Sequence, residues 1–176
     1  MYTHPVAVGR DAVVYTIVPC ALGFVLVAMT SRGVHRVALG DTAEELETTL
    51  RDALHAAELV RDDAALGDMS ASMVALASGA SLSHALPLDV RGTAFQQRVW
   101  RELQRIPRGE TITYADLAAR IGAPKAVRAV GTACGANPAA MVVPCHRVVR
   151  ADGSLGGYAW GVERKERLLR DESKTP

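Results

Sequence analysis

Three strand-length runs of apolar and β-branched residues follow one another near the start of the chain. They are AVVYTIVPC, GFVLVAMT and GVHRVAL, and they are punctuated by Pro19, Gly23 and Gly33. Runs of this length and composition, bounded by glycine and proline, are typical of neighbouring antiparallel strands. They therefore predict a small antiparallel sheet in meander order, which limits the fold more than any other part of the sequence does.

A helix is expected directly after this sheet, over residues 42–59. Thr42 is a suitable cap, because Glu45 follows it three residues later, as in a capping box. Leucines then recur at helical spacing, at positions Leu46, Leu50 and Leu54. The stretch thus predicts an amphipathic helix.

Residues 68–79 predict a further helix, and the stretch rich in Gly, Ser and Pro at residues 79–92 indicates a linker. This division implies an N-terminal domain of residues 1–88 and a C-terminal domain of residues 89–176. The first domain holds no cluster of residues that suits catalysis or a metal ion, so its expected role is structural.

The second half of the chain predicts three helices. One covers residues 94–106 behind a Thr93 cap, another begins at Thr113, and the third lies within residues 123–135, after Gly122. Two short helices about a glycine turn form a helix-turn-helix, a shape that is also common in proteins that bind no DNA.

The third of these helices has two different faces. Its apolar spacing is that of Val127, Val130 and Cys134. Its outward face carries Arg128, Gly131, Thr132 and Gly135. A reader of the major groove would offer several long polar side chains to the base edges, whereas a smooth face with one arginine suits the minor groove and binding without sequence preference. The alternative is that these small residues pack against another helix.

The charges of the chain are divided unevenly, although its formal net charge is only +1. Residues 1–90 hold 5 Lys and Arg against 11 Asp and Glu, a net charge of −6. Residues 91–176 hold 15 against 8, a net charge of +7, which indicates that the second half faces a polyanion. Charge alone equally allows the halves to neutralise each other across a domain interface.

Composition narrows the class of protein. With 49% hydrophobic and 22% charged residues the chain is typical of a globular protein, and it lacks the apolar run of about 18 residues that a membrane span needs. The opening residues, MYTHPVAVGRD, do not have the pattern of a signal peptide. Three cysteines without metal-ligand spacing favour free thiols in a reducing compartment. We therefore expect a cytoplasmic protein that needs no metal and no other cofactor.

A thiol and an imidazole stand side by side in the stretch VPCHRVV, at Cys145 and His146. The pair suits nucleophilic chemistry, but the apolar neighbours also suit a buried strand with an inert cysteine. In an extended strand, neighbouring side chains point to opposite faces, so the two groups would need a turn or a bridging water to act together.

Three longer stretches carry a resemblance to a known family. They are RGTAFQQRVW, IPRGETITYADLAARIGAPKAVRAVG and NPAAMVVPCHRVVRADGSLGGYAWGVERKERLLRDE. Together they resemble the O6-alkylguanine-DNA alkyltransferases, or methylated-DNA–protein-cysteine methyltransferases, and most closely the C-terminal domain of the adaptive-response (Ada) branch. The resemblance covers residues 89–172, while residues 1–88 match more loosely, in the order of strands and helices.

The resemblance implies an α+β fold with two domains. The N-terminal domain would be ribonuclease-H-like, with a small antiparallel sheet and helices. The C-terminal domain would be mostly helical and similar to a winged helix-turn-helix.

The resemblance also implies catalytic roles. Cys145 is the expected alkyl acceptor, and His146 is the expected base, which acts on the thiol through a water. Glu172 orients the imidazole, a thiol version of the triad arrangement. Asn137 is the hinge between the second helix of the helix-turn-helix and the active-site segment.

Other positions are implied in binding DNA and the base. Because the lesion lies inside a duplex, the nucleotide has to be flipped out. Tyr114 pushes at the 3′ phosphate and offers its hydroxyl to the base, while Arg128 fills the vacated stack. Gly131, Thr132 and Gly135 form the smooth helix face. The implied positions of the base pocket are Val148, through its backbone, with Tyr158, Ala159, Trp160 and Lys165.

Two positions depart from the common pattern of the family. Ala159 replaces a serine whose hydroxyl contacts O6, so that only its backbone N–H remains for that contact. Trp160 replaces a glycine, and an indole at that point is expected to stand over the site and to exclude a benzyl group while it admits a methyl group. The alternative is that Trp160 only packs on the surface.

The expected function is direct reversal of DNA damage. The alkyl group of O6-alkylguanine, and of O4-alkylthymine, is transferred irreversibly to Cys145, once per molecule. The expected partner is double-stranded DNA with a flipped base, bound by a monomer away from membranes. A cysteine hydrolase and a non-catalytic DNA-binding relative are the alternative classes. The first would turn over its substrate, and the second would lack the cysteine.

Overall fold

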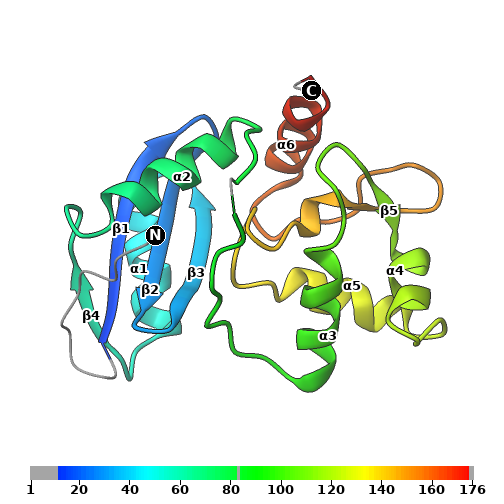
Figure 1. Ribbon diagram of the computed structural model, residues 1–176, viewed down its shortest axis with the longest axis horizontal. Coiled ribbons are helices and arrows are strands. Elements are labelled where there is room, and N and C mark those ends of the chain that lie inside the picture. The colour runs from blue at the N-terminus through cyan, green and yellow to red at the C-terminus, as the bar shows by residue number, and fades with distance from the viewer. Residues whose placement is uncertain (1–11, 83, 175–176) are drawn as a thin grey trace.

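The computed structural model describes residues 12–82 and 84–174, so the opening segment on which the signal-peptide argument depends lies outside it. Figure 1 shows the sheet and the helices that cover it at the left of the molecule, and a second group of helices at the right. A linker runs down between these two parts. The molecule therefore has the α+β architecture that the sequence predicts. None of the described helices is long and apolar enough to pass through a membrane.

The sheet contains four strands in the order β3-β2-β1-β4. Its strands are β1 (Ala12–Cys20), β2 (Gly23–Thr30), β3 (Gly33–Gly40) and β4 (Glu58–Arg61). The first three form the predicted antiparallel meander, in which Cys20 lies opposite Gly23 and Thr30 lies opposite Gly33. Two-residue turns join these strands, and both glycines have positive φ, which a residue with a Cβ rarely adopts.

The fourth strand corrects the helix that was predicted over residues 42–59. Helix α1 (Ala43–Ala53) starts as expected, because the Thr42 hydroxyl accepts a hydrogen bond from Glu45 N at 3.2 Å. It ends before Leu54, and the chain then turns and pairs β4 parallel to β1. The free edge of β1 supplies backbone partners for β4, and this long-range pairing outweighs the local helical tendency of the alanine-rich sequence.

Helices cover both faces of the sheet. On one face α1 packs against a cluster that includes Tyr15, Leu26 and Leu46. On the other face lies α2 (Gly67–Ala77), close to the helix predicted over residues 68–79. Its Met69 and Met73 pack in a cluster that includes Val25 of the sheet. The sheet is thus covered on both faces, and its described residues form no cluster that could bind a metal ion.

The second half of the chain is mostly helical. Its elements are α3 (Ala94–Leu103), β5 (Ile112–Thr113), α4 (Tyr114–Arg120), α5 (Val127–Gly135), the 3-10 turn η1 (Cys145–Arg147), β6 (Val148–Val149) and α6 (Val162–Lys174). Capping boxes start α3 at Thr93 and α4 at Thr113. The Trp100 indole donates a hydrogen bond to Ala133 O at 2.8 Å, which ties α3 to α5. The predicted helix-turn-helix is therefore present as α4 and α5.

Strand β3 forms the contact between the sheet and the helical half. Its residue Val37 donates to Pro138 O at 2.9 Å and accepts from Ala140 N at 3.0 Å. Val34 makes the same pair of bonds to the linker, donating to Pro87 O and accepting from Asp89 N. The edge strand of the sheet is thus bonded to the segment that leads into η1.

Few ion pairs cross between the two halves. Among the described residues, Arg164 pairs with Asp41 across the division used for the charge count, whereas Arg32 and Asp89 pair within the first half. Most of the excess positive charge of the second half is therefore not neutralised at this contact. That favours the polyanion over neutralisation between domains as the reason for the charge division.

Candidate active site

Cys145 lies in the 3-10 turn η1 and not in a strand, so the sequence alternative of a buried extended segment is wrong. The extended backbone starts only at β6, and its pairing with β5 fixes the end of the turn. Asn137 holds the thiol from the other side, because its side-chain N–H donates to Cys145 Sγ at 3.1 Å and to Val143 O at 2.7 Å. The amide oxygen of Asn137 accepts from Ala139 N at 3.0 Å, so the whole side chain is fixed.

A buried carboxylate holds the imidazole. His146 Nε2 and Glu172 Oε1 are 2.9 Å apart, and both side chains are buried. Arg147, which sequence reasoning missed, donates from Nε and Nη2 to the same carboxylate at 2.9 and 2.7 Å. Helix α6 thus brings Glu172 to two consecutive residues of η1.

The protonation states follow from burial and these contacts. Burial raises the pKa of Cys145 to about 11, although the hydrogen bond from Asn137 acts in the other direction. Burial lowers the pKa of His146, against the opposing effect of Glu172. Burial acts to raise the pKa of Glu172, but the hydrogen bonds from His146 and Arg147 outweigh it and bring this pKa to about 2. The site therefore holds a neutral thiol, a neutral imidazole and a carboxylate, and the thiol needs a base before it can react.

The second ring nitrogen of His146 is available as that base. Glu172, as an ionised carboxylate, accepts the hydrogen of Nε2, which leaves Nδ1 without a proton in the neutral ring. Nδ1 is buried and has no hydrogen-bond partner among the described residues, and the same holds for the hydroxyl of Tyr158. Buried polar atoms usually have a partner, so Nδ1 has the capacity to take a proton or to bind a bridging water.

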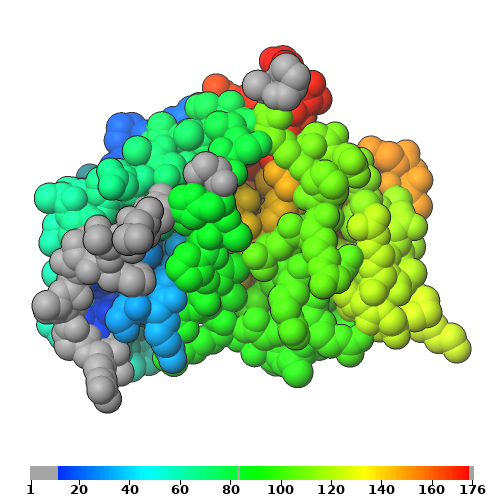
Figure 2. Space-filling view, viewed as in Figure 1, coloured from blue at the N-terminus to red at the C-terminus, as the bar shows by residue number. Residues whose placement is uncertain are grey.

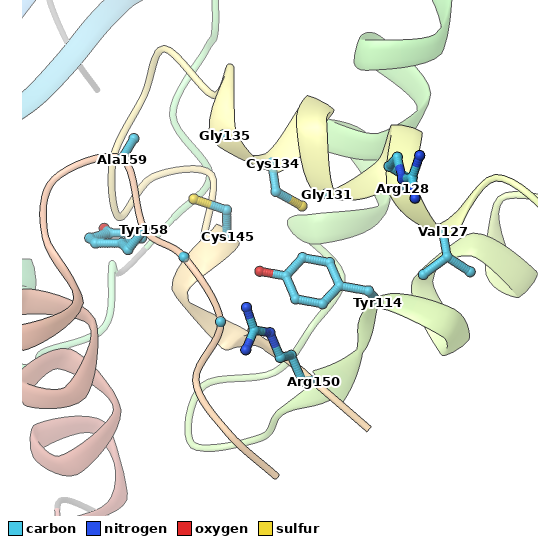
Figure 3. A pocket seen from close by; sticks show the side chains of 12 residues that line it. Tyr114, Val127, Arg128, Gly131, Cys134, Gly135, Cys145, Arg150, Tyr158 and Ala159 are labelled. Atoms are coloured by element: carbon cyan, nitrogen blue, oxygen red, sulfur yellow. The ribbon is translucent and has the colours of Figure 1, made fainter. Parts of the chain in front are cut away.

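A pocket of about 690 Å³ opens above the thiol. Figure 3 shows Cys145, Cys134 and Tyr114 around the space between α5 and the loop that follows β6, with the Tyr114 hydroxyl directed toward Cys145. It is lined by Tyr114, Val127, Arg128, Gly131, Cys134, Gly135, Cys145, Arg150, Gly156, Gly157, Tyr158 and Ala159. This volume suits one flat aromatic ring system together with part of an attached sugar-phosphate backbone.

A second, smaller hollow lies on the other side of the turn. It has about 370 Å³ and is lined by residues of the linker, by Arg108 and by Pro144 and Arg147. Figure 2 shows this face of the molecule, with the hollow between the linker and the segment that follows α3. Of these two pockets, Cys145 lines the one of about 690 Å³ and not the one of about 370 Å³.

The structure brings most of the predicted positions together. Those that line the pocket are Cys145, Tyr114, Arg128, Gly131, Gly135, Tyr158 and Ala159. Asn137 bonds the thiol directly, whereas His146, the next residue of η1, bonds Glu172. Thr132 is exposed on α5 beside the pocket, with its hydroxyl bonded to Arg128 O at 3.2 Å.

Val148 and Lys165 are joined to each other and do not line the pocket. The buried Lys165 ammonium donates to Val148 O at 2.6 Å, to Leu155 O, and to Gly157 O at 3.4 Å. It also lies 5.8 Å from the centre of the Tyr114 ring. Lys165 therefore holds the pocket loop in shape, in contrast to the expected position beside the base.

Trp160 differs from the prediction as well. The indole is partly buried against all three hydrophobic clusters and makes an edge contact with Tyr158, with ring centres 5.2 Å apart. It is not part of the pocket lining, so the expected place over the site is wrong. The reason is that the loop buries the large apolar surface of the indole at the contact between the halves, which is the more stable location.

We expect Trp160→Gly to destabilise the protein by about 2 kcal/mol or more, because the indole fills space between three clusters. Urea unfolding measures this change. The ratio of the rates with O6-benzylguanine and O6-methylguanine should stay as it is in the wild type. A ratio that rises in the variant while stability is unchanged would contradict the packing role and restore the gate.

Three further pocket residues were not singled out for function by sequence reasoning. Val127 was placed with the apolar face of its helix, but it is 37% exposed, because α5 begins there and its first turn projects beyond the core. Cys134 was interpreted as helix packing, yet its thiol also lines the pocket. Arg150 shows no sign of a function in the sequence apart from its position directly after Val148 and Val149.

Comparison with known proteins agrees with this geometry. The family described as 6-O-methylguanine DNA methyltransferase, DNA binding domain, matches residues 94–174. The crystal structure of Mycobacterium tuberculosis OGT in complex with DNA is 36% identical and superposes with a TM-score of 0.76, over 91% of this chain and 92% of that chain. The chain belongs to the O6-methylguanine-DNA methyltransferase family.

Curated relatives of this family are more similar in sequence. The bifunctional transcriptional activator/DNA repair enzyme Ada of Escherichia coli is 47% identical over 93% of this chain and 46% of its own length. The methylated-DNA–protein-cysteine methyltransferase of Mycolicibacterium paratuberculosis is 60% identical over 48% of this chain and 51% of its own length. The chain thus spans about half the length of the curated relatives that it matches.

Proposed function

We propose that this methyltransferase-family protein repairs alkylated DNA by taking the alkyl group from O6 of guanine, or O4 of thymine, onto Cys145. The observation that carries the proposal is the buried thiol of Cys145 at the floor of an aromatic-sized pocket, with a fixed imidazole and carboxylate behind it. In the transfer, the bond from sulfur to the alkyl carbon forms and the bond from that carbon to O6 breaks. Guanine is the leaving group.

The proton of the thiol has a defined destination. Because the pKa of Cys145 is about 11, nearly all of the thiol is protonated at neutral pH. His146 Nδ1 takes this proton through a water. The ionised Glu172, which accepts a hydrogen bond from Nε2, stabilises the resulting imidazolium. Burial raises the pKa of Tyr114 to about 12, so its hydroxyl stays protonated and can donate to the base that leaves.

The same pocket explains how the substrate is reached. The exposed face of α5 combines Arg128 with glycines, and this face can approach a minor groove closely. The base then has to leave the stack to reach a thiol below the surface. Arg128 would fill its place in the duplex. One chain carries all of these parts, so we propose a monomer that acts on the DNA of the nucleoid in the cytoplasm.

The reaction is proposed to occur once per molecule. A methyl thioether has no good leaving group, and the nearby Cys134 is a weak nucleophile because burial raises its pKa to about 12. Neither water nor a second thiol can therefore restore Cys145 at a useful rate.

Intact mass spectrometry tests the proposal. After incubation with excess duplex DNA that holds one O6-methylguanine, we expect the protein mass to rise by one methyl group per chain and no more. Peptide mapping should place the methyl on Cys145. Repeated turnover, or a methyl group on Cys134 or Cys20, would exclude the proposed reaction, and unmodified duplex is the control.

A further inference from the structure

Two arginines stand at different sides of the pocket mouth. Arg128 projects from α5, and Arg150 projects from the loop that follows β6, with the Tyr114 ring between them in the view of Figure 3. Arg128 has its role in the proposed function, as the residue that enters the stack. Arg150 has no assigned role, although it is exposed and lines the same pocket.

A tight turn fixes the backbone of Arg150. Its N–H donates to Ser154 O at 2.8 Å, and its carbonyl accepts from Gly153 N at 3.0 Å. Asp152, the nearest carboxylate along the chain, accepts from the backbone N–H of Ser154 at 2.9 Å and from its hydroxyl at 2.7 Å. The hydrogen bonds of the Asp152 carboxylate are therefore made within the turn, and only its charge acts on Arg150.

The guanidinium of Arg150 acts on Asp152 and Tyr114 through its charge alone. Within residues 12–82 and 84–174, no hydrogen bond or ion pair joins it to another side chain. A planar fork of N–H donors that is fixed at its base and unpaired at its tip is well suited to a phosphate.

The stem of Arg150 is held on the same side of the pocket as the Tyr114 hydroxyl. Both approach Gly156, where a Cβ would lie 3.1 Å from Tyr114 Oη and 3.6 Å from Arg150 Cγ. Gly156 has a φ of +70° and no side chain, so the loop admits both groups. A base that enters the pocket past Tyr114 would bring its own sugar-phosphate backbone to this side of the mouth.

We infer that Arg150 binds a backbone phosphate next to the flipped nucleotide and holds the nucleotide in the extrahelical position. The inference rests on the proposed function, since it needs a flipped nucleotide in this pocket. It separates two tasks, because Arg128 replaces the missing base inside the duplex while Arg150 retains the base that has left it.

Binding as a function of salt concentration gives the first test. Affinity for a duplex with one O6-methylguanine is measured in the Cys145→Ala background, so that no reaction occurs. Arg150→Gln should weaken binding by about tenfold and lower the slope of log affinity against log salt by about one unit, because one phosphate contact is lost. Arg170→Gln, which removes the same charge from an exposed position of α6 outside the pocket lining, should leave the slope unchanged.

Neutral phosphates locate the contact. A series of duplexes carries one methylphosphonate at successive positions around the lesion. With Arg150 present, one position should weaken binding clearly more than the others, and with Arg150→Gln that position should cost no further affinity. If the two losses simply add at every position, Arg150 does not bind a phosphate beside the lesion, and the inference fails.

The free base distinguishes this inference from the proposed function. With Cys145 intact, Arg150→Gln should accept the methyl group from free O6-methylguanine at the wild-type rate, because that substrate has no phosphate. Equal slowing with free base and duplex would overturn the inference. If the wild type itself accepted no methyl group, the proposed function would fail, while the salt and methylphosphonate measurements would still decide whether Arg150 contacts a phosphate.

Discussion

Replacing Cys145 by alanine should reduce alkyl transfer to the uncatalysed background, while affinity for duplex DNA should change by less than about threefold. Cys145 is the alkyl acceptor of the proposed reaction, whereas the proposed binding surface lies on α5 and on the pocket rim. Alanine is smaller and apolar, and a buried site that is 4% exposed tolerates it with a modest loss of packing. Transfer of a radioactive methyl group and a DNA-binding titration measure the two quantities.

Cys134→Ala is the matched control, since it removes a second thiol from the same pocket. This variant should transfer the methyl group at close to the wild-type rate. If transfer were lost in Cys134→Ala and persisted in Cys145→Ala, the acceptor would be Cys134, and the assignment to Cys145 would be wrong.

Glu172→Gln should slow methyl transfer by at least about a hundredfold and lower the free energy of unfolding at pH 7 by about 3 kcal/mol. The glutamine keeps the shape of the side chain but loses the charge that holds His146 and Arg147. Breaking a buried charged network by neutralising one partner commonly costs about 3–5 kcal/mol. Single-turnover kinetics and urea unfolding give the two values.

The effect of Glu172 on stability depends on pH in a defined direction. The pKa of this carboxyl is about 2 in the fold and 4.5 as its ordinary value. A lowered pKa contributes stability that is fully present above about pH 4.5 and is lost as the pH falls toward 2. The wild type should therefore lose about 3 kcal/mol over this range that Glu172→Gln does not lose.

Asp171→Asn is the control for this experiment, because it removes a carboxylate one residue earlier in the same helix. Asp171 pairs only with exposed basic side chains, Arg167, Arg170 and Lys174, among the ion pairs of the described residues. Such pairs contribute less than about 1 kcal/mol. If Asp171→Asn and Glu172→Gln gave the same loss and the same pH profile, the buried network would not be the cause.

Local sequence signals predicted most of the architecture. Gly23 and Gly33 fix two-residue turns, and Thr42, Thr93 and Thr113 cap helices where they were expected to. Each of these signals acts over a few residues, so the sequence alone reveals it. Strand β4 was missed because it exists through pairing with β1, whose paired residues lie 46 positions earlier in the chain.

The site shows the same division between local and distant causes. The resemblance to the family named Cys145, His146 and Glu172, and the structure joins His146 to Glu172 in the same turn that carries Cys145. Arg147 and Arg150 were missed because an arginine in a basic segment carries no local sign of its partner. Trp160 was misplaced because its environment consists of surfaces from both halves of the chain, which no single stretch of sequence displays.

The backbone hydrogen bonds of Val37 to Pro138 and Ala140 connect the sheet with the segment that positions the thiol. The same segment positions Asn137, whose amide holds the sulfur of Cys145. A substitution deep in the sheet, far from any DNA, would therefore act as a defect in repair, because a frayed β3 would release this support. In the proposed reaction, the acidic half of the molecule would thus help to position the acceptor sulfur, although it contributes no residue to the pocket lining.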